Sequence, residues 1–228
     1  MFAFPFGRSV AISRAVPCCA RGVSRSSRTR GGIGGRSCVR RNSYHRARIS
    51  CYALPNAIEP EDLRNEIGES CALAVLDETE IVYALRLPAR RILSANLGIG
   101  SRLPAHLASL GRVMLASLSK DKRAAYLQSV ELMPVTARTV TDPDVLDKQL
   151  DLVEAQGYAW IDGELDPAIC GIAVPLRDHA GRVVAAISIN TISGMASETQ
   201  AKKKFLVPLK RTAQDIRTQM VAVRQPAF

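Results

Sequence analysis

Two polar side chains near the carboxyl end of the chain are placed to act together. Ser188 and Asn190 fall within the apolar run 182–190, which predicts a long β-strand, and residues two apart in a strand point to the same face. A hydroxyl and a carboxamide on one face can hydrogen-bond a small polar ligand, or they can both face water. We prefer the first interpretation.

Two cationic or titratable groups lie earlier, in and after the glycine-containing loop 98–104. The guanidinium of Arg102 offers a planar fork that matches a carboxylate, although a solvated loop arginine is an equal alternative. His106 can donate to the same ligand, and the alternative is a histidine that faces solvent at the start of a helix. A guanidinium and an imidazole that both faced a ligand would suit an organic acid, and at this point both alternatives stay open.

Further polar groups fall at a predicted helix start and in a predicted turn. Ser109, Leu110 and Gly111 can present a hydroxyl and backbone N–H groups to an anion, or Leu110 can be core and Gly111 a close backbone contact. Asp162 and Glu164 can accept from a ligand hydroxyl, or serve as ordinary turn residues. An enzyme that uses these two carboxyl groups as acid and base is the rival hypothesis.

Other kinds of chemistry find little support in the sequence. The chain has only three histidines, and it contains no Ser-His-Asp order, phosphate-binding loop or metal-ligand spacing. Of the six cysteines, only Cys71 and Cys170 lie beyond residue 58, far apart and outside any CxxC pattern. We therefore expect no catalytic residues, no cofactor and no metal site.

Charge divides the chain at Glu59, the first acidic residue. Of 31 basic residues, 11 precede Glu59, all of them arginine, which leaves 20 against all 21 acidic residues. The net charge of +10 therefore belongs to residues 1–58. We expect an unstructured Arg-rich segment at 1–58 and a globular domain at 59–228.

Three interpretations compete for the Arg-rich segment. Arginine and serine without acids are typical of an organellar transit peptide, and also of a disordered arm that binds nucleic acid through phosphate charge. Arginine without lysine is also what GC-rich codons give when read out of frame. We prefer the third interpretation, in which the segment is not the native coding frame.

Periodicity in the remainder predicts an α+β fold. Two antiparallel hairpins are expected, one near each end of the domain, with helices between them and a long helix after the second. Strands are predicted at 71–76, 81–87, 92–97, 158–162, 171–176 and 182–190, and helices at 104–118, 120–130, 143–156 and 197–220. We expect an antiparallel sheet with helices packed on one face and a ligand on the other.

These segments carry motifs that resemble a known family. One run is Gly100-Ser-Arg-Leu-Pro104-Ala-His106, followed by Leu110-Gly-Arg-Val-Met-Leu-Ala116. The other combines Gly157-Tyr-Ala159, Glu164, Ile172-Ala-Val-Pro-Leu176 and Gly181-Arg-Val-Val-Ala-Ala-Ile-Ser188. Together they resemble the effector-binding domain of IclR-type bacterial transcription regulators, especially the branch that controls the protocatechuate and β-ketoadipate pathway. The resemblance runs from about Glu61 to the C-terminus.

The resemblance implies a GAF-like domain that binds a small metabolite and forms dimers or tetramers. Its ligand cup would use the segment from Arg102 to Gly111, the segment after Glu164 that includes Ile169 and Gly171, and the last long strand. Gly171 departs from relatives, which often carry a ligand-binding side chain there. We expect a small aromatic or keto acid as the ligand.

The resemblance also implies a winged helix-turn-helix before this domain, and residues 1–58 contain no such pattern. We therefore expect DNA binding only if a winged-helix domain is supplied. No stretch approaches eighteen apolar residues without a charge, so we expect no membrane partner and a cytoplasmic location.

Overall fold

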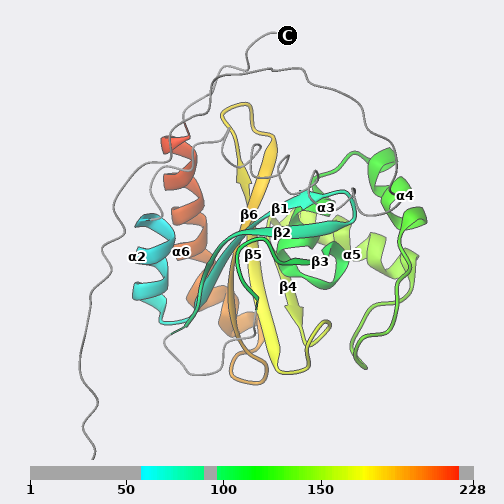
Figure 1. The fold of residues 1–228 in the computed structure, drawn as a ribbon, viewed down its shortest axis with the longest axis horizontal. Coiled ribbons are helices and arrows are strands. Elements are labelled where there is room, and N and C mark those ends of the chain that lie inside the picture. Colours follow the sequence, from blue (N-terminus) through cyan, green and yellow to red (C-terminus); the bar gives the residue numbers. More distant parts are fainter. Residues whose placement is uncertain (1–57, 90–96, 221–228) are drawn as a thin grey trace, which may run out of the picture. The chain divides into compact units, whose positions relative to one another are not determined.

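Alternating apolar positions build a six-stranded antiparallel sheet in the order β3-β2-β1-β6-β5-β4 (Figure 1). The computed structural model describes residues 58–89 and 97–220. The strands are β1 (Ser70–Asp77), β2 (Glu80–Leu87), β3 (Arg102–Pro104), β4 (Ala159–Asp162), β5 (Ile169–Arg177) and β6 (Val183–Ile192). The β1–β2 and β5–β6 hairpins pair with each other through β1 and β6, so the two ends of the domain form the middle of one sheet.

Helices cover both faces of this sheet (Figure 1). On one face lie α2 and α6, and on the other lie the short 3-10 helix η1 with α3, α4 and α5. Their bounds are α2 (Ile58–Ile67), η1 (Ala105–Leu107), α3 (Ser109–Ala116), α4 (Lys120–Ser129), α5 (Pro143–Gln156) and α6 (Glu198–Gln219).

The two faces carry side chains of different size. Toward α6, the central strands present large apolar residues such as Leu73, Ile172 and Ile187. Toward α3, the same strands present small ones, including Ala72, Ala74, Ala173 and Ala186. Small side chains let a helix approach the sheet closely, so α3 contacts five of the six strands.

Local signals set the ends of α5 and α6 as the sequence predicts, whereas the helix predicted at 104–118 is divided into η1 and α3 by the extended residue Ala108. Asp142 accepts hydrogen bonds from two backbone N–H groups at the start of α5, Pro143 occupies its first position, and Gly157 ends it in the left-handed conformation. Ser197 and Gln200 form a capping box at the start of α6. Pro208 lies inside α6, and the helix continues past it.

A β-bulge interrupts the pairing of β1 with β2. Ala72 pairs with Arg86 and Leu73 with Leu85, but Ala74 pairs with Tyr83, which leaves Ala84 as the extra residue. Residues three apart in a regular strand face opposite sides of the sheet. Because of the bulge, Tyr83 and Arg86 face the same side, the one that α3 covers.

The predicted α+β class and antiparallel sheet are confirmed, and one part of the prediction is corrected. Helices were expected on one face only, whereas the structure has a helical layer on each. The cause is that β1, β5 and β6 have buried residues on both faces over most of their length. The Arg-rich segment 1–57 and residues 92–96 of the strand predicted at 92–97 lie outside the described residues.

Candidate functional site

A cavity of about 560 Å³ opens between the small-residue face of the sheet and the start of α3. Volumes of 300–1,000 Å³ are typical of sites for small organic ligands. Most of its wall is apolar, with leucine and isoleucine side chains from β3, η1, α3, β4, β5 and the turn after β4. These include Leu103, Leu107, Leu110, Ile161, Leu165 and Ile169.

Polar groups interrupt this wall at a few positions. From the sheet come Ser70, Tyr83, Arg86 and Asn190, and Ser109 comes from the first turn of α3. Glu69 and Asp166 add carboxyl groups, Glu69 nearly buried and Asp166 exposed. A mainly apolar wall with a few fixed polar groups suits a compact organic molecule with one charged end.

Arg86 is the one basic residue among the described residues that line the cavity. Its guanidinium carbon lies 5.5 Å from the centre of the Tyr83 ring, a cation–π contact between two residues that line the cavity. Within the described part of the chain, no carboxylate lies at ion-pair distance from Arg86. A guanidinium in that position is available to bind an anionic ligand.

Five residues predicted for the site line the cavity. They are Ser109, Leu110, Ile169, Gly171 and Asn190. They come from α3, β5 and β6, which the sheet and the approach of α3 bring together.

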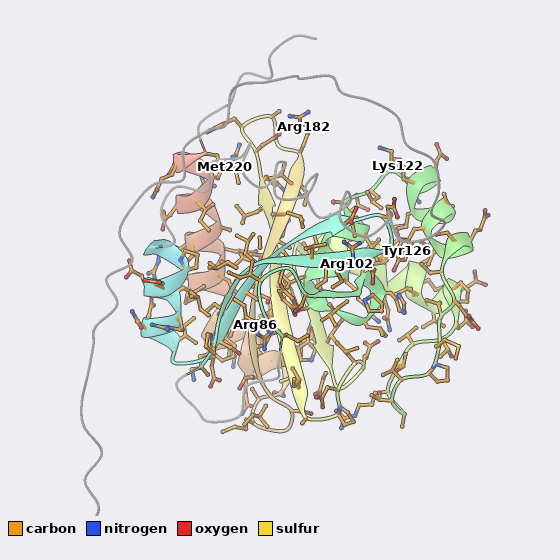
Figure 2. The ribbon with its side chains drawn as sticks, viewed as in Figure 1. Arg86, Arg102, Lys122, Tyr126, Arg182 and Met220 are labelled. Atoms are coloured by element: carbon orange, nitrogen blue, oxygen red, sulfur yellow. The ribbon has the colours of Figure 1, made fainter. Side chains whose placement is uncertain are left out.

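Arg102 has a different role from the one expected. Its guanidinium binds Asp77 and Glu80 at 2.6 Å each, on the two sides of the β1–β2 turn. The ion pairs hold the edge strand β3 against that turn, and Arg102 does not line the cavity. Arg86 and Arg102 lie well apart in the view of Figure 2. The cavity therefore has a cationic residue, but it is Arg86 and not the predicted Arg102.

His106 is also turned away from the cavity. It is 4% exposed, and both its backbone N–H and its Nδ1 lie within hydrogen-bond distance of the Tyr126 hydroxyl. Burial, with a smaller effect from the charge of Arg112, lowers the pKa of His106 to about 4. Burial raises the pKa of Tyr126 to about 12. This histidine is neutral at physiological pH and serves to pack η1 against α4.

Gly111 and Ser188 lie beneath the cavity. A Cβ at Gly111 would overlap the carbonyl oxygen of Ala105, so glycine is what lets η1 cross α3 at that point. Ser188 is fully buried, and its Oγ accepts from Asn190 Nδ2 at 3.1 Å. Of the predicted pair on β6, only Asn190 therefore faces the cavity, and Ser188 fixes its orientation.

Glu164 belongs to a buried network that the sequence analysis missed. Arg112 Nη2 donates to Glu164 Oε2 at 2.5 Å, Nη1 donates to Gln149 at 2.6 Å, and Nε donates to the His106 carbonyl at 2.9 Å. Burial raises the pKa of Glu164, and the positive charge of Arg112 offsets part of this rise. Leu107 follows His106 directly, Leu165 follows Glu164 directly, and both leucines line the cavity. The network therefore anchors two walls of the cavity to α3 and α5.

The rival acid-base pair is not assembled at this site. Asp162 binds Arg138 at 2.8 Å and Ser193 at 2.5 Å, outside the cavity, while Glu164 is held by Arg112. The thiols of Cys71 and Cys170 are buried, and burial raises their pKa values to about 12 and about 11. No cluster of metal-ligating side chains is found within 58–89 and 97–220.

Comparison with known proteins agrees with this architecture. The family model described as bacterial transcriptional regulator IclR C-terminal matches residues 55–218. The Pca regulon regulatory protein of Pseudomonas putida is 32% identical over 173 residues, which is 75% of this chain and 60% of that protein. This chain therefore spans less than two thirds of the length of that relative.

Solved structures give the same result. The structure of the Thermotoga maritima IclR superposes with a TM-score of 0.70 at 26% identity, covering 80% of this chain and 73% of that one. The inducer-binding domain of PobR from Acinetobacter, a double mutant in complex with 3-hydroxybenzoic acid, superposes with a TM-score of 0.66 at 27% identity and covers 70% and 93%. The chain belongs to the IclR family of bacterial transcriptional regulators, and residues 55–218 are its C-terminal, effector-binding domain.

Proposed function

We propose that this domain senses a small aromatic or keto acid in the cavity beneath α3. The observation that carries the proposal is Arg86, a guanidinium without a carboxylate partner among the described residues, on the wall of a largely apolar cavity. The start of α3 adds backbone N–H groups and the positive end of a helix, and no side chain caps it. Both features favour an anionic group on an apolar skeleton.

Two relatives support an acid as the ligand. The PobR domain was solved with 3-hydroxybenzoic acid, and a further IclR homologue from Microbacterium hydrocarbonoxydans was solved with 4-hydroxybenzoate. The Pca regulon regulator is a relative by sequence. We infer that binding, not catalysis, is what this cavity does, because neither Asp162 nor Glu164 lines it.

We also propose how ligand binding in the cavity changes the structure of the domain outside the cavity. A ligand contacts the first turn of α3 and the turn after β4, and the Arg112 network ties both to α5. A ligand that fits one arrangement of these elements better than another shifts their populations. We propose that this shift acts on paired domains in a homodimer or tetramer in the cytoplasm, and on DNA when a winged-helix domain is present.

Calorimetry on the full chain tests the acid-binding proposal. The panel contains benzoate, 3,4-dihydroxybenzoate and 3-oxoadipate, and we expect a micromolar dissociation constant for at least one of them. Arg86→Met keeps the length of the side chain but removes the charge-assisted hydrogen bonds, so affinity should fall about 10- to 100-fold.

The matched control is Lys122→Met, which removes one positive charge from the exposed face of α4, away from the cavity (Figure 2). It should bind like the unaltered chain. Absence of heat with every acid, or equal affinity for the Arg86 and Lys122 variants, would contradict the proposal.

A further inference from the structure

The loop 98–101 holds the residue that lies beside Arg86 on the cavity wall. Tyr83 donates its backbone N–H to the Ser101 carbonyl at 3.0 Å, and the Tyr83 carbonyl accepts from Gly100 N–H at 2.8 Å. These bonds continue the pairing of β2 with β3 onto the loop. The glycine-containing loop therefore fixes the backbone of a residue that lines the cavity.

This loop is closed by its own residues. Gly98 N–H donates to Ser101 Oγ at 3.0 Å, and Ser101 N–H donates to the Gly98 carbonyl at 3.1 Å. Gly100 has a φ of 87°, in the left-handed region where glycine is favoured, and an added Cβ there would meet no described atom within 4 Å beyond its chain neighbours. Glycine is thus needed at this position for backbone conformation and not for space. Leu97 and Leu103, one on each side of the loop, line the cavity.

Tyr83 and Arg86 contact each other on the cavity face of the sheet. The bulge at Ala84 puts both side chains on that face, and the guanidinium carbon lies 5.5 Å from the centre of the ring. Tyr83 is 5% exposed, and burial raises its pKa, while the charge of Arg86 and a hydrogen bond with it offset part of this rise. The phenol is therefore neutral at physiological pH and keeps its hydrogen.

The chemistry of this pair specifies a carboxylate. A guanidinium has only donors, so the Tyr83 oxygen accepts from Arg86 and its own hydrogen can donate to a ligand. The other N–H groups of Arg86 donate as well, so the pair offers donors from two side chains. A carboxylate can accept on both of its oxygens, whereas the NH2 group of an amide would oppose one of these donors.

The pair lies at one end of the cavity, with the apolar wall beyond it. In the sheet, β1 and β6 separate β2 from β5, so three strand spacings, about 14 Å, lie between the strand of Tyr83 and that of Ile169. A carboxylate held at β2 directs the rest of its molecule along the cavity toward Leu110, Ile161 and Ile169.

We propose that Tyr83 and Arg86, held in register by the loop 98–101, form a two-donor clamp for the carboxylate of the effector, and that Tyr83 sets the preference for an acid over its amide. This inference rests on the proposed function, because it requires that an acid occupy the cavity. It places the carboxylate on β2 and not at the start of α3.

The test measures a preference, defined as the dissociation constant of an amide divided by that of its acid. Calorimetry on the full chain compares benzoate with benzamide, 3,4-dihydroxybenzoate with 3,4-dihydroxybenzamide, and 4-oxopentanoate with 4-oxopentanamide. At least one acid should bind about 10-fold or more tightly than its amide, as expected for buried hydrogen bonds to a charged group.

Tyr83→Phe removes one oxygen and keeps the ring beside Arg86. Affinity for the acid should fall about 10-fold, and affinity for the amide about threefold or less, because a hydrogen bond to a neutral carbonyl is weaker than one to a carboxylate. The matched control is Tyr158→Phe, which removes the same oxygen from another nearly buried tyrosine. That hydroxyl bonds Glu198, and its ring packs on the α6 side of the sheet. The control should keep the full preference.

A second pair of variants tests the loop. Gly100→Ala strains a left-handed backbone, and the displaced loop should reduce the preference about threefold or more. The matched control is Gly194→Ala, in the connection between β6 and α6. Its φ is 83°, and an added Cβ there would also meet no described atom within 4 Å beyond its chain neighbours. The two variants carry the same strain, but only Gly100 belongs to the loop that holds Tyr83, so the control should keep the preference.

The possible failures are distinguishable. If no acid binds, the proposed function and this inference both fall. If acids bind but Tyr83→Phe keeps the full preference, or weakens acid and amide equally, the clamp is overturned and the acid-binding proposal stands. If Gly100→Ala binds as Gly194→Ala does, the role of the loop is overturned. Tyr83→Phe decides on the clamp even if the Gly100 variant does not fold, because it removes one atom and adds no bulk.

Discussion

At the residue scale, the burial of His106 makes stability depend on pH. Its pKa falls from 6.5 to about 4 in the folded protein, so between these values the unfolded chain binds more protons than the folded one. Stability therefore declines as the pH falls through this window. By pH 5 the loss from His106 alone is about 2 kcal/mol relative to pH 7.

Urea unfolding between pH 7 and pH 5 measures this effect. The raised pKa of Glu164 acts in the opposite direction, so the raw slope for the unaltered chain mixes the two groups. The His106→Gln variant cannot gain the proton, and its free energy of unfolding should fall less over the same range. Parallel profiles for the two proteins would show that His106 does not titrate as the structure implies.

Also at the residue scale, the sequence identifies the residues of this site better than their individual roles. Ser109 and Asn190, which line the cavity, were predicted because a helix start and strand periodicity indicate where they point, and Gly171 was predicted from the family resemblance. Arg102 was predicted from its guanidinium fork, and Arg86 was not considered; in the structure Asp77 and Glu80 bind Arg102. Those ion pairs depend on strand pairing, which a single sequence does not show.

At the element scale, the crossing of η1 over α3 depends on Gly111. Replacing Gly111 with alanine raises helix propensity by about 1 kcal/mol, but the new methyl group would overlap the Ala105 backbone, which cannot rotate away. We expect a net destabilisation of about 2 kcal/mol or more, measured by chemical unfolding. The cavity wall at Leu107 and Ala108 should shift as well.

The control for this change is Gly98→Ala. Apart from its two chain neighbours, no atom of the described residues lies within 4 Å of the position that a Cβ would occupy there, and the backbone is not left-handed. Its stability should stay within about 0.5 kcal/mol of the unaltered chain. A stable Gly111 variant with the same unfolding midpoint would mean that η1 and α3 are further apart than described.

Elements with local signals were predictable and those set by tertiary pairing were not. The caps at Asp142 and Ser197 fix helix starts from adjacent residues alone. The bulge at Ala84 leaves no mark in the apolar pattern, and simple alternation would place Tyr83 and Arg86 on opposite faces. Arg86, the proposed acid-binding residue, reaches the cavity face of the sheet because of that bulge.

At the scale of the whole molecule, every described residue that lines the cavity comes after position 68. A chain that begins at residue 55, where the family match begins, should therefore bind the acids of the panel with affinities within about twofold of the full chain. Parallel titrations of the two chains measure this. A large loss of affinity in the shorter chain would instead show that the Arg-rich segment contributes to binding.

The unequal faces of the sheet also predict how the domain tolerates sequence drift. Where the strands meet α6, shortening a leucine or isoleucine leaves a void, and partial repacking can absorb part of the cost. Where β1, β5 and β6 meet α3, most of the residues are already alanine, serine or glycine, and almost any replacement adds volume beneath a closely packed helix. In a comprehensive mutational scan, the alanine-lined face should therefore tolerate fewer substitutions than the face toward α6. New ligand specificities should arise more readily from changes at the rim of the cavity than from changes on the alanine-lined sheet below it.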